Sequence, residues 1–214
     1  MTTLASAREV FDYWLGPDPD DPATGESRRE LWYRGGVAVD AEIGARFGEV
    51  VREALGGAPW VSAWRDSALG QAALVIVLDQ FTRNLFRGTR DAWSGDRVAL
   101  DVAKAAVATG TDRTLPIAAR IFLYHPFHHS EVPHEQEAAV QLLTGLSEEA
   151  GAGWASYFER SLQSTRGHRD IVVRFGRFPH RNGALGRITT PEEAAFLSEN
   201  PNDFGQARRK APAQ

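Results

Sequence analysis

Apolar residues recur every three or four positions along most of this chain, and glycine or proline separates the periodic runs. This spacing places the apolar side chains on one face of a helix, whereas a half-buried strand would alternate apolar and polar residues. No segment shows convincing alternation of period two. The pattern therefore predicts an all-α protein.

The helix boundaries follow from residues that favour starts and stops. Gly16-Pro17 ends the first helix, and the proline-rich segment 17–27 is predicted to be a loop. Asp40 is a plausible N-cap for a helix that ends at Gly56-Gly57. The apolar run 74–78 could be a buried strand, but its length and its alanines favour a helix within 67–88. Further helices are expected over 96–109, 115–124, 133–145, 154–178 and 190–197.

The predicted architecture is a set of about eight or nine helices packed as antiparallel pairs. No self-similarity at 34 residues is strong enough to define a repeat, so any likeness to a helical-repeat array is one of architecture. The chain is predicted to form a single domain over residues 1–205. The polar residues 206–214 are expected to be a disordered tail.

Composition narrows the range of partners. The 214 residues are 43% hydrophobic and carry a formal net charge of -4, so no general basic field favours nucleic acid or an anionic membrane surface. The absence of cysteine excludes disulfides and thiolate chemistry. The N-terminus lacks a signal-peptide pattern, and no run of 18 apolar residues indicates a membrane span. A cytoplasmic location is expected.

The first polar cluster consists of Asp79, Arg83, Asn84 and Arg87, directly after the most apolar run of the chain. The Asp79 carboxylate is expected to point into the fold, where Arg83 one turn later is a local partner. One interpretation is a structural ion pair. The other is that Arg83 and Arg87 hold an anionic group, because guanidinium groups bind carboxylate or phosphate in a planar fork.

The second cluster is the segment HPFHHSEVPHE, from His125 to Glu135. Its histidines suggest a metal site, but Pro126 and Pro133 interrupt any single helix and no metal-ligand spacing is present. Histidines in a solvated loop, or facing a pocket, are the alternatives. His129 and Glu131 are the preferred candidates because they precede a helix start at Pro133, where free backbone N–H groups favour anions.

The third cluster, RGHRDIVVRFGRFPHRN, ends a long helix with several arginines. His168 shares the apolar face of that helix with Ile171, Val172 and Phe175. Arg174 and Arg177 could simply be cations that the helix dipole favours at the C-terminal end. His180, Arg181 and Asn182 follow in a glycine-rich turn, from which side chains can converge on a ligand.

Three segments resemble motifs of the bacterial family catalogued as domain of unknown function 924: LDQFTRNLFRG, FLYHPFHHSE and HRDIVVRFGRFPHRN. The resemblance extends over nearly the whole chain and implies a tetratricopeptide-like helical fold. It implies no established activity. Thr82, His125 and His128 depart from the residues expected at their positions in the family, which argues against a metal site built on His125 or His128.

Two functional hypotheses follow. The first is a pocket for a small anionic metabolite in which all three clusters meet, in a protein that could be a hydrolase or transferase. Its catalytic candidates are His129, Glu131, His168 and Asp79; its ligand-binding candidates are Arg83, Asn84, Arg87, Arg174, Arg177, His180, Arg181 and Asn182. No metal ligand is assigned, and the sequence identifies no cofactor. The second is a non-enzymatic module that binds a peptide or protein partner, with the same polar residues acting as a structural network.

Overall fold

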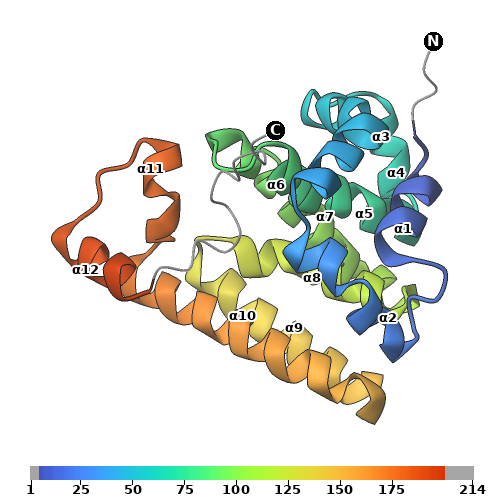
Figure 1. The fold of residues 1–214 in the computed structure, drawn as a ribbon. Coiled ribbons are helices and arrows are strands. Elements are labelled where there is room, and N and C mark those ends of the chain that lie inside the picture. The colour runs from blue at the N-terminus through green and yellow to red at the C-terminus, as the bar shows by residue number, and fades with distance from the viewer. Residues whose placement is uncertain (1–4, 201–214) are drawn as a thin grey trace.

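The computed structural model describes residues 5–200, and Figure 1 shows a molecule built from helices. No strand occurs within these residues, which confirms the all-α prediction. Over the same range, no helix combines the length and apolar composition needed to span a bilayer. The proposed domain end at 205 and the tail 206–214 lie outside the described residues.

The helices outnumber the eight or nine expected, so that count was wrong. Short helices of four to six residues, α2, α4, α6 and α11, account for the difference. The α-helices are α1 (Ala7–Leu15), α2 (Pro22–Ser27), α3 (Val37–Leu55), α4 (Trp60–Arg65), α5 (Ala68–Val75), α6 (Thr82–Leu85), α7 (Asp96–Thr109), α8 (Ile117–His129), α9 (Pro133–Ala150), α10 (Ala155–Phe175), α11 (Asn182–Leu185) and α12 (Pro191–Glu199).

Short turns of other helix types connect them. Two are π-helical, η1 (Glu30–Arg34) and η2 (Ile76–Phe81). The 3₁₀ turns are η3 (Arg90–Trp93), η4 (Thr111–Thr114), η5 (Ala152–Trp154) and η6 (Pro179–Arg181). The turn η2 joins α5 to α6 without a break, so residues 68–85 form one helical segment with a locally widened turn. Such widened turns occur frequently at functional sites.

Three local predictions need correction. The segment 17–27 is not all loop, because the Asp21 side chain accepts from the backbone N–H of Ala23 and starts α2. Asp40 is not an N-cap, because α3 already begins at Val37 and Asp40 lies in its first turn. Pro126 does not end the preceding helix, since α8 continues to His129 with the proline inside it.

The long helix predicted over 154–178 ends earlier, at Phe175, because Gly176 adopts the left-handed conformation with φ 67°. Two other predicted helices have the expected boundaries at one or both ends. The helix predicted over 96–109 is α7, and Pro133 stands at the start of α9, which extends beyond the predicted end to Ala150. Thr190 and Glu193 cap α12 reciprocally: each side chain accepts from the backbone N–H of the other residue. This is the capping box that the sequence predicts.

The core surrounds α5 and α8. Helix α8 packs against α5, α7 and α9, and Figure 1 shows α9 lying beside α10. Aromatic rings from distant segments join the core, with Trp14 against Phe81 and Phe122, and Trp32 against Phe122. The five residues 74–78 are fully buried, as expected for a helix that is apolar on all sides.

Candidate functional site

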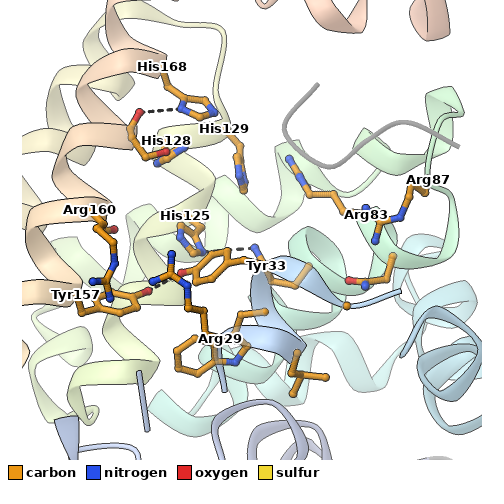
Figure 2. A pocket seen from close by; sticks show the side chains of 17 residues that line it. Arg29, Tyr33, Arg83, Arg87, His125, His128, His129, Tyr157, Arg160 and His168 are labelled. Atoms are coloured by element: carbon orange, nitrogen blue, oxygen red, sulfur yellow. Dashed lines mark hydrogen bonds between the residues drawn. The ribbon is translucent and has the colours of Figure 1, made fainter. Parts of the chain in front are cut away.

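A pocket of about 420 Å³ opens between η1, the segment η2–α6, the end of α8 and the middle of α10. Figure 2 shows side chains from all four segments directed toward it. A pocket of this size suits a small organic molecule. Its lining residues are Arg29, Leu31, Trp32, Tyr33, Gly35, Gln80, Arg83, Asn84, Arg87, His125, His128, His129, Tyr157, Arg160, Ser161, Ser164 and His168.

Four histidines form one side of the pocket, here called the histidine wall: His125, His128, His129 and His168. The first three share a face of α8 because they lie three and four residues apart. His168 comes from α10, and its ring centroid lies 3.9 Å from that of His128. The rings of His128 and His129 are 5.1 Å apart. The two helices thus bring the four imidazoles into one cluster.

His129 is bonded to a buried carboxylate. Its Nδ1 lies 2.8 Å from Oδ1 of Asp79, whose side chain is fully buried. An ionised carboxylate can only accept, so Nδ1 of His129 donates and Nε2 is left unprotonated. Asp79 also accepts from Nε2 of Gln80 at 2.5 Å and pairs with Nη1 of Arg83 at 3.1 Å. The predictions that Asp79 enters the fold and that Arg83 is its local partner are confirmed.

Two further histidines are fixed in the same tautomer. Nδ1 of His168 lies 2.9 Å from the carbonyl oxygen of Ser164, which can only accept. Nδ1 of His128 lies 3.0 Å from Oγ1 of Thr165, and that hydroxyl donates its hydrogen to the Ser161 carbonyl at 2.9 Å. The Thr165 oxygen must therefore accept from His128. In both rings Nδ1 carries the hydrogen and Nε2 is the acceptor.

Burial keeps the histidine wall uncharged. It lowers the pKa of His125 and of His168 to about 4, and it holds the pKa of His128 and His129 well below the ordinary value. The nearby charge of Arg83 lowers the pKa of all four further. The imidazoles are thus neutral at pH 7, and in His128 and His129 the unprotonated nitrogen is Nε2.

Arg83 and Arg87 line another side of the pocket, where carboxylates already compensate their charge. Arg83 pairs with Asp79 and, at 2.9 Å, with Asp96. Both Nε and Nη2 of Arg87 donate to Asp40 at 3.1 Å. The Asn84 amide also donates to Asp40, at 2.8 Å. Asp40 thus ties α3 to this wall of the pocket.

Four residues at the end of the pocket away from Arg83 and Arg87 form what we call the tyrosine end: Arg29, Tyr33, Tyr157 and Arg160 (Figure 2). The hydroxyl oxygens of Tyr33 and Tyr157 lie 2.5 Å apart and share one hydrogen bond. Arg160 pairs with Glu26, and the two side chains are 42% and 60% exposed. Within residues 5–200, Arg29 has no carboxylate partner.

Several predicted site residues lie outside the pocket. Glu131 accepts from the backbone N–H of Phe178 at 2.8 Å and pairs with Arg187 at 2.7 Å, so the N–H groups of the α9 start are not its partners. Arg174 and Arg177 pair with Glu192 and Glu193 of α12. These contacts fasten the C-terminal helices to α10. The three clusters were expected to meet, and the third contributes only His168.

The turn after α10 lies behind the histidine wall. Nη2 of Arg181 donates to the carbonyl oxygen of His129 at 3.0 Å, at the C-terminal end of α8, where the helix dipole favours a cation. The Asn182 amide donates to Glu193 at 3.2 Å. The His180 ring lies 5.4 Å from that of Phe178. Arg181, Asn182 and His180 thus organise the turn without lining the pocket.

Sequence reasoning missed several residues of the pocket: Arg29, Tyr33, Gln80, His125, His128, Tyr157 and Arg160. For His125 and His128 a signal existed, because their spacing with His129 is helical, but Pro126 was taken to break the helix. The residues of the tyrosine end come from segments more than a hundred positions apart, and no local pattern relates them.

The histidine wall does not form a recognisable metal centre. Among residues 5–200, no three His, Cys, Asp or Glu side chains are grouped as metal ligands. The Nδ1 atoms of His128, His129 and His168 are engaged by protein groups instead. What the arrangement offers chemically is a set of neutral imidazoles facing guanidinium groups.

Comparison with known proteins relates the chain to uncharacterised relatives. Residues 10–201 match the family described as bacterial protein of unknown function (DUF924). A solved structure of a protein of unknown function from Agrobacterium tumefaciens is 34% identical in sequence. The similarity covers 91% of this chain and 97% of the other, with a TM-score of 0.72. A search of curated proteins found no match. Because the family match spans most of its length, this chain belongs to the DUF924 family of bacterial proteins of unknown function.

Proposed function

We propose that this protein binds a small anionic molecule in the pocket. The observation that carries the proposal is the composition of the lining: four arginines line the pocket, and the carboxylates that pair with three of them, Arg83, Arg87 and Arg160, are not among the described lining residues. A cleft lined by charges of one sign concentrates ligands of the opposite sign. The neutral histidine wall adds hydrogen-bonding groups without adding negative charge.

The pair of His129 and Asp79 gives the same pocket the elements of a general base. Asp79 orients the ring through Nδ1, which leaves Nε2 to take a proton from a hydroxyl group or a water molecule. Arg83, although paired with Asp79 and Asp96, lines the same pocket and is a hydrogen-bond donor for a group on which negative charge develops. Hydrolases and transferases are among the enzyme classes that use a base in this way.

The alternative proposal is a tetratricopeptide-like module that binds a peptide or protein partner. It is favoured by the ion pairs of Arg174, Arg177 and Arg187, in the manner of a structural network. The first two join the end of α10 and the turn after it to α12, and the third joins the segment between α11 and α12 to the turn before α9. In that case the pocket would be a by-product of helix packing. Filling the pocket would then leave the function unchanged.

A variant that fills the pocket tests the first proposal. Ser161 lines the pocket from α10, and Gln163 is an exposed residue of the same helix. We expect phosphate or carboxylate metabolites to raise the melting temperature of the wild type, since a ligand at 100 times its Kd stabilises the native state by about 2.7 kcal/mol. Ser161→Trp should abolish this rise, whereas Gln163→Trp should keep it.

The measurement is a thermal-shift screen of the full chain, followed by calorimetric titration of any compound that binds. The proposal is wrong if no anion stabilises the wild type. It is equally wrong if Ser161→Trp responds to the same anion as strongly as Gln163→Trp.

A further inference from the structure

The tyrosine end holds the cationic charge of the pocket that is least compensated. Arg83 and Arg87 each have a partly or fully buried carboxylate within 3.1 Å, whereas Arg29 has none among the described residues. The pair of Arg160 with Glu26 is exposed on both sides, and such pairs contribute little free energy. Arg29 and Arg160 are therefore the two guanidinium groups that a ligand can recruit at least cost.

The two tyrosines add a hydrogen-bond donor at the same place. Two hydroxyl hydrogens are present, and the bond between the Tyr33 and Tyr157 oxygens uses one of them. The second has no acceptor among residues 5–200. Arg29 and Arg160 both lie close enough to act electrostatically on the Tyr157 hydroxyl. A phosphate or carboxylate group placed here would meet two guanidinium groups and a free phenol hydrogen.

The histidine wall, at the other end, accepts hydrogen bonds. The hydrogens on Nδ1 of His128 and His129 are committed to Thr165 and Asp79, so their Nε2 atoms remain as acceptors. Neither Nε2 atom has a partner among the described residues. A neutral nitrogen acceptor forms a hydrogen bond with a hydroxyl group. It has no positive charge to attract a second anionic group. The two ends therefore require different chemical groups.

Building on the proposed function, we infer that the ligand is a hydroxylated organic anion, which places its phosphate or carboxylate at the tyrosine end and a hydroxyl group at the histidine wall. In this orientation the hydroxyl lies at Nε2 of His128 or His129. The anionic group and the hydroxyl belong to one small molecule, because the pocket of about 420 Å³ contains both ends.

Calorimetric titration of the full chain with matched probes tests the orientation. Glycerol 3-phosphate and propyl phosphate share the anionic group and the three-carbon chain but differ in hydroxyl groups, as lactate and propionate do for carboxylates. We expect the hydroxylated member of one pair to bind at least about tenfold more tightly, because a buried acceptor left without its donor is costly. The pair that binds identifies the anionic group.

Variants locate the two ends. Arg29→Gln should weaken the hydroxylated probe by roughly tenfold or more, as expected for loss of a charged hydrogen bond. Arg34→Gln removes the same charge from η1 outside the pocket and should change affinity less than about twofold. Tyr33→Phe should weaken binding several-fold, and His128→Phe should reduce the preference for the hydroxylated probe while the deoxy probe still binds.

The possible outcomes separate this inference from the proposed function. If the probes bind and Ser161→Trp blocks them, but Arg29→Gln behaves like Arg34→Gln, the assignment of the tyrosine end is wrong and the anion pocket stands. Equal affinity for the hydroxylated and deoxy probes overturns the role of the histidine wall. If no probe binds saturably to the wild type, both proposals fail.

Discussion

At the scale of single residues, burial determines the charge of the histidine wall. His125, His128, His129 and His168 sit among packed helices next to guanidinium groups, and their pKa values are all lowered. In the unfolded chain the same imidazoles return to the ordinary pKa of about 6.5. The native state must therefore keep them unprotonated at a pH where the unfolded chain binds protons.

This difference predicts how stability depends on pH. Between pH 6.5 and about 4 the unfolded chain binds more protons than the native state at His125 and His168. The free energy of unfolding should be largest above pH 7 and should fall with decreasing pH, by up to about 1.4 kcal/mol per pH unit for each histidine. Urea unfolding at pH 7.5, 6.5 and 5.5 measures the slope.

The matched variants are His125→Gln and His134→Gln. His134 lies outside the histidine wall, with 77% of its side chain accessible and its Nε2 3.1 Å from Glu135. His125→Gln should reduce the slope more than His134→Gln does. Glu131 and Glu193 also have lowered pKa values, but their contribution to the free energy of unfolding is lost only below about pH 4.5, which is below the pH values measured. Equal slopes for the wild type and His125→Gln would contradict the prediction.

Residue roles were predictable from the sequence where the partner is local. Arg83 pairs with Asp79 one turn away, as expected from the spacing. Arg177 was assigned to a ligand, yet its partner is Glu193, 16 positions along the chain. The carboxylates of α12 are visible in the sequence, but their pairing depends on how α12 folds back against the end of α10. That packing is not encoded in a local pattern.

At the scale of elements, the widened turn η2 determines what surrounds the pocket. It carries Asp79 and Gln80 in the middle of the most buried segment of the chain. Gly95, the residue before α7, packs directly on this turn: a Cβ atom there would lie 2.2 Å from the carbonyl oxygen of Leu78. The position of α7, and with it Asp96, depends on this close approach.

Two glycine substitutions should therefore have opposite effects. Gly95→Ala forces backbone atoms apart and should lower the free energy of unfolding by about 1–3 kcal/mol, as overpacking does. Gly48→Ala lies inside α3, where a new Cβ atom would meet nothing within 4 Å. It should raise stability by roughly 0.5–1 kcal/mol because alanine favours the helix. Urea unfolding of both variants checks the signs, and a stable Gly95→Ala would refute the packing argument.

Long helices with clear caps were predictable, whereas short ones were not. Thr190 and Glu193 specify the start of α12 by their own hydrogen bonds, and the apolar spacing of α7 spans several turns. By contrast, α6 and α11 have four residues each, too few for periodicity to register. The continuation of α8 through Pro126 was missed because the neighbouring helices that pack around it are not visible from the local sequence.

At the scale of the whole molecule, one cluster of buried apolar residues connects the chain from Val10 to Phe158. Trp14, Phe81 and Phe122 bring together α1, η2 and α8. No smaller group of helices among the described residues has a comparable core of its own. That the chain forms a single domain stays a prediction.

A single domain should unfold in one cooperative transition. Urea unfolding followed by far-UV circular dichroism reports on the helices, and tryptophan fluorescence reports on the core rings. We expect the two curves to coincide. Two resolved transitions, or midpoints that differ beyond error, would show that part of the chain folds independently.

The hydrogen bond between Tyr33 and Tyr157, which both line the pocket, joins residues 124 positions apart. Only a fragment that reaches from Tyr33 to Tyr157 contains both tyrosines, so a nascent or proteolysed chain that lacks either one cannot form the complete pocket. Occupancy of this hollow is consequently a property of the finished fold. Protection by a ligand against proteolysis would therefore measure the fraction of fully folded molecules in a sample, because partly folded molecules would not be protected.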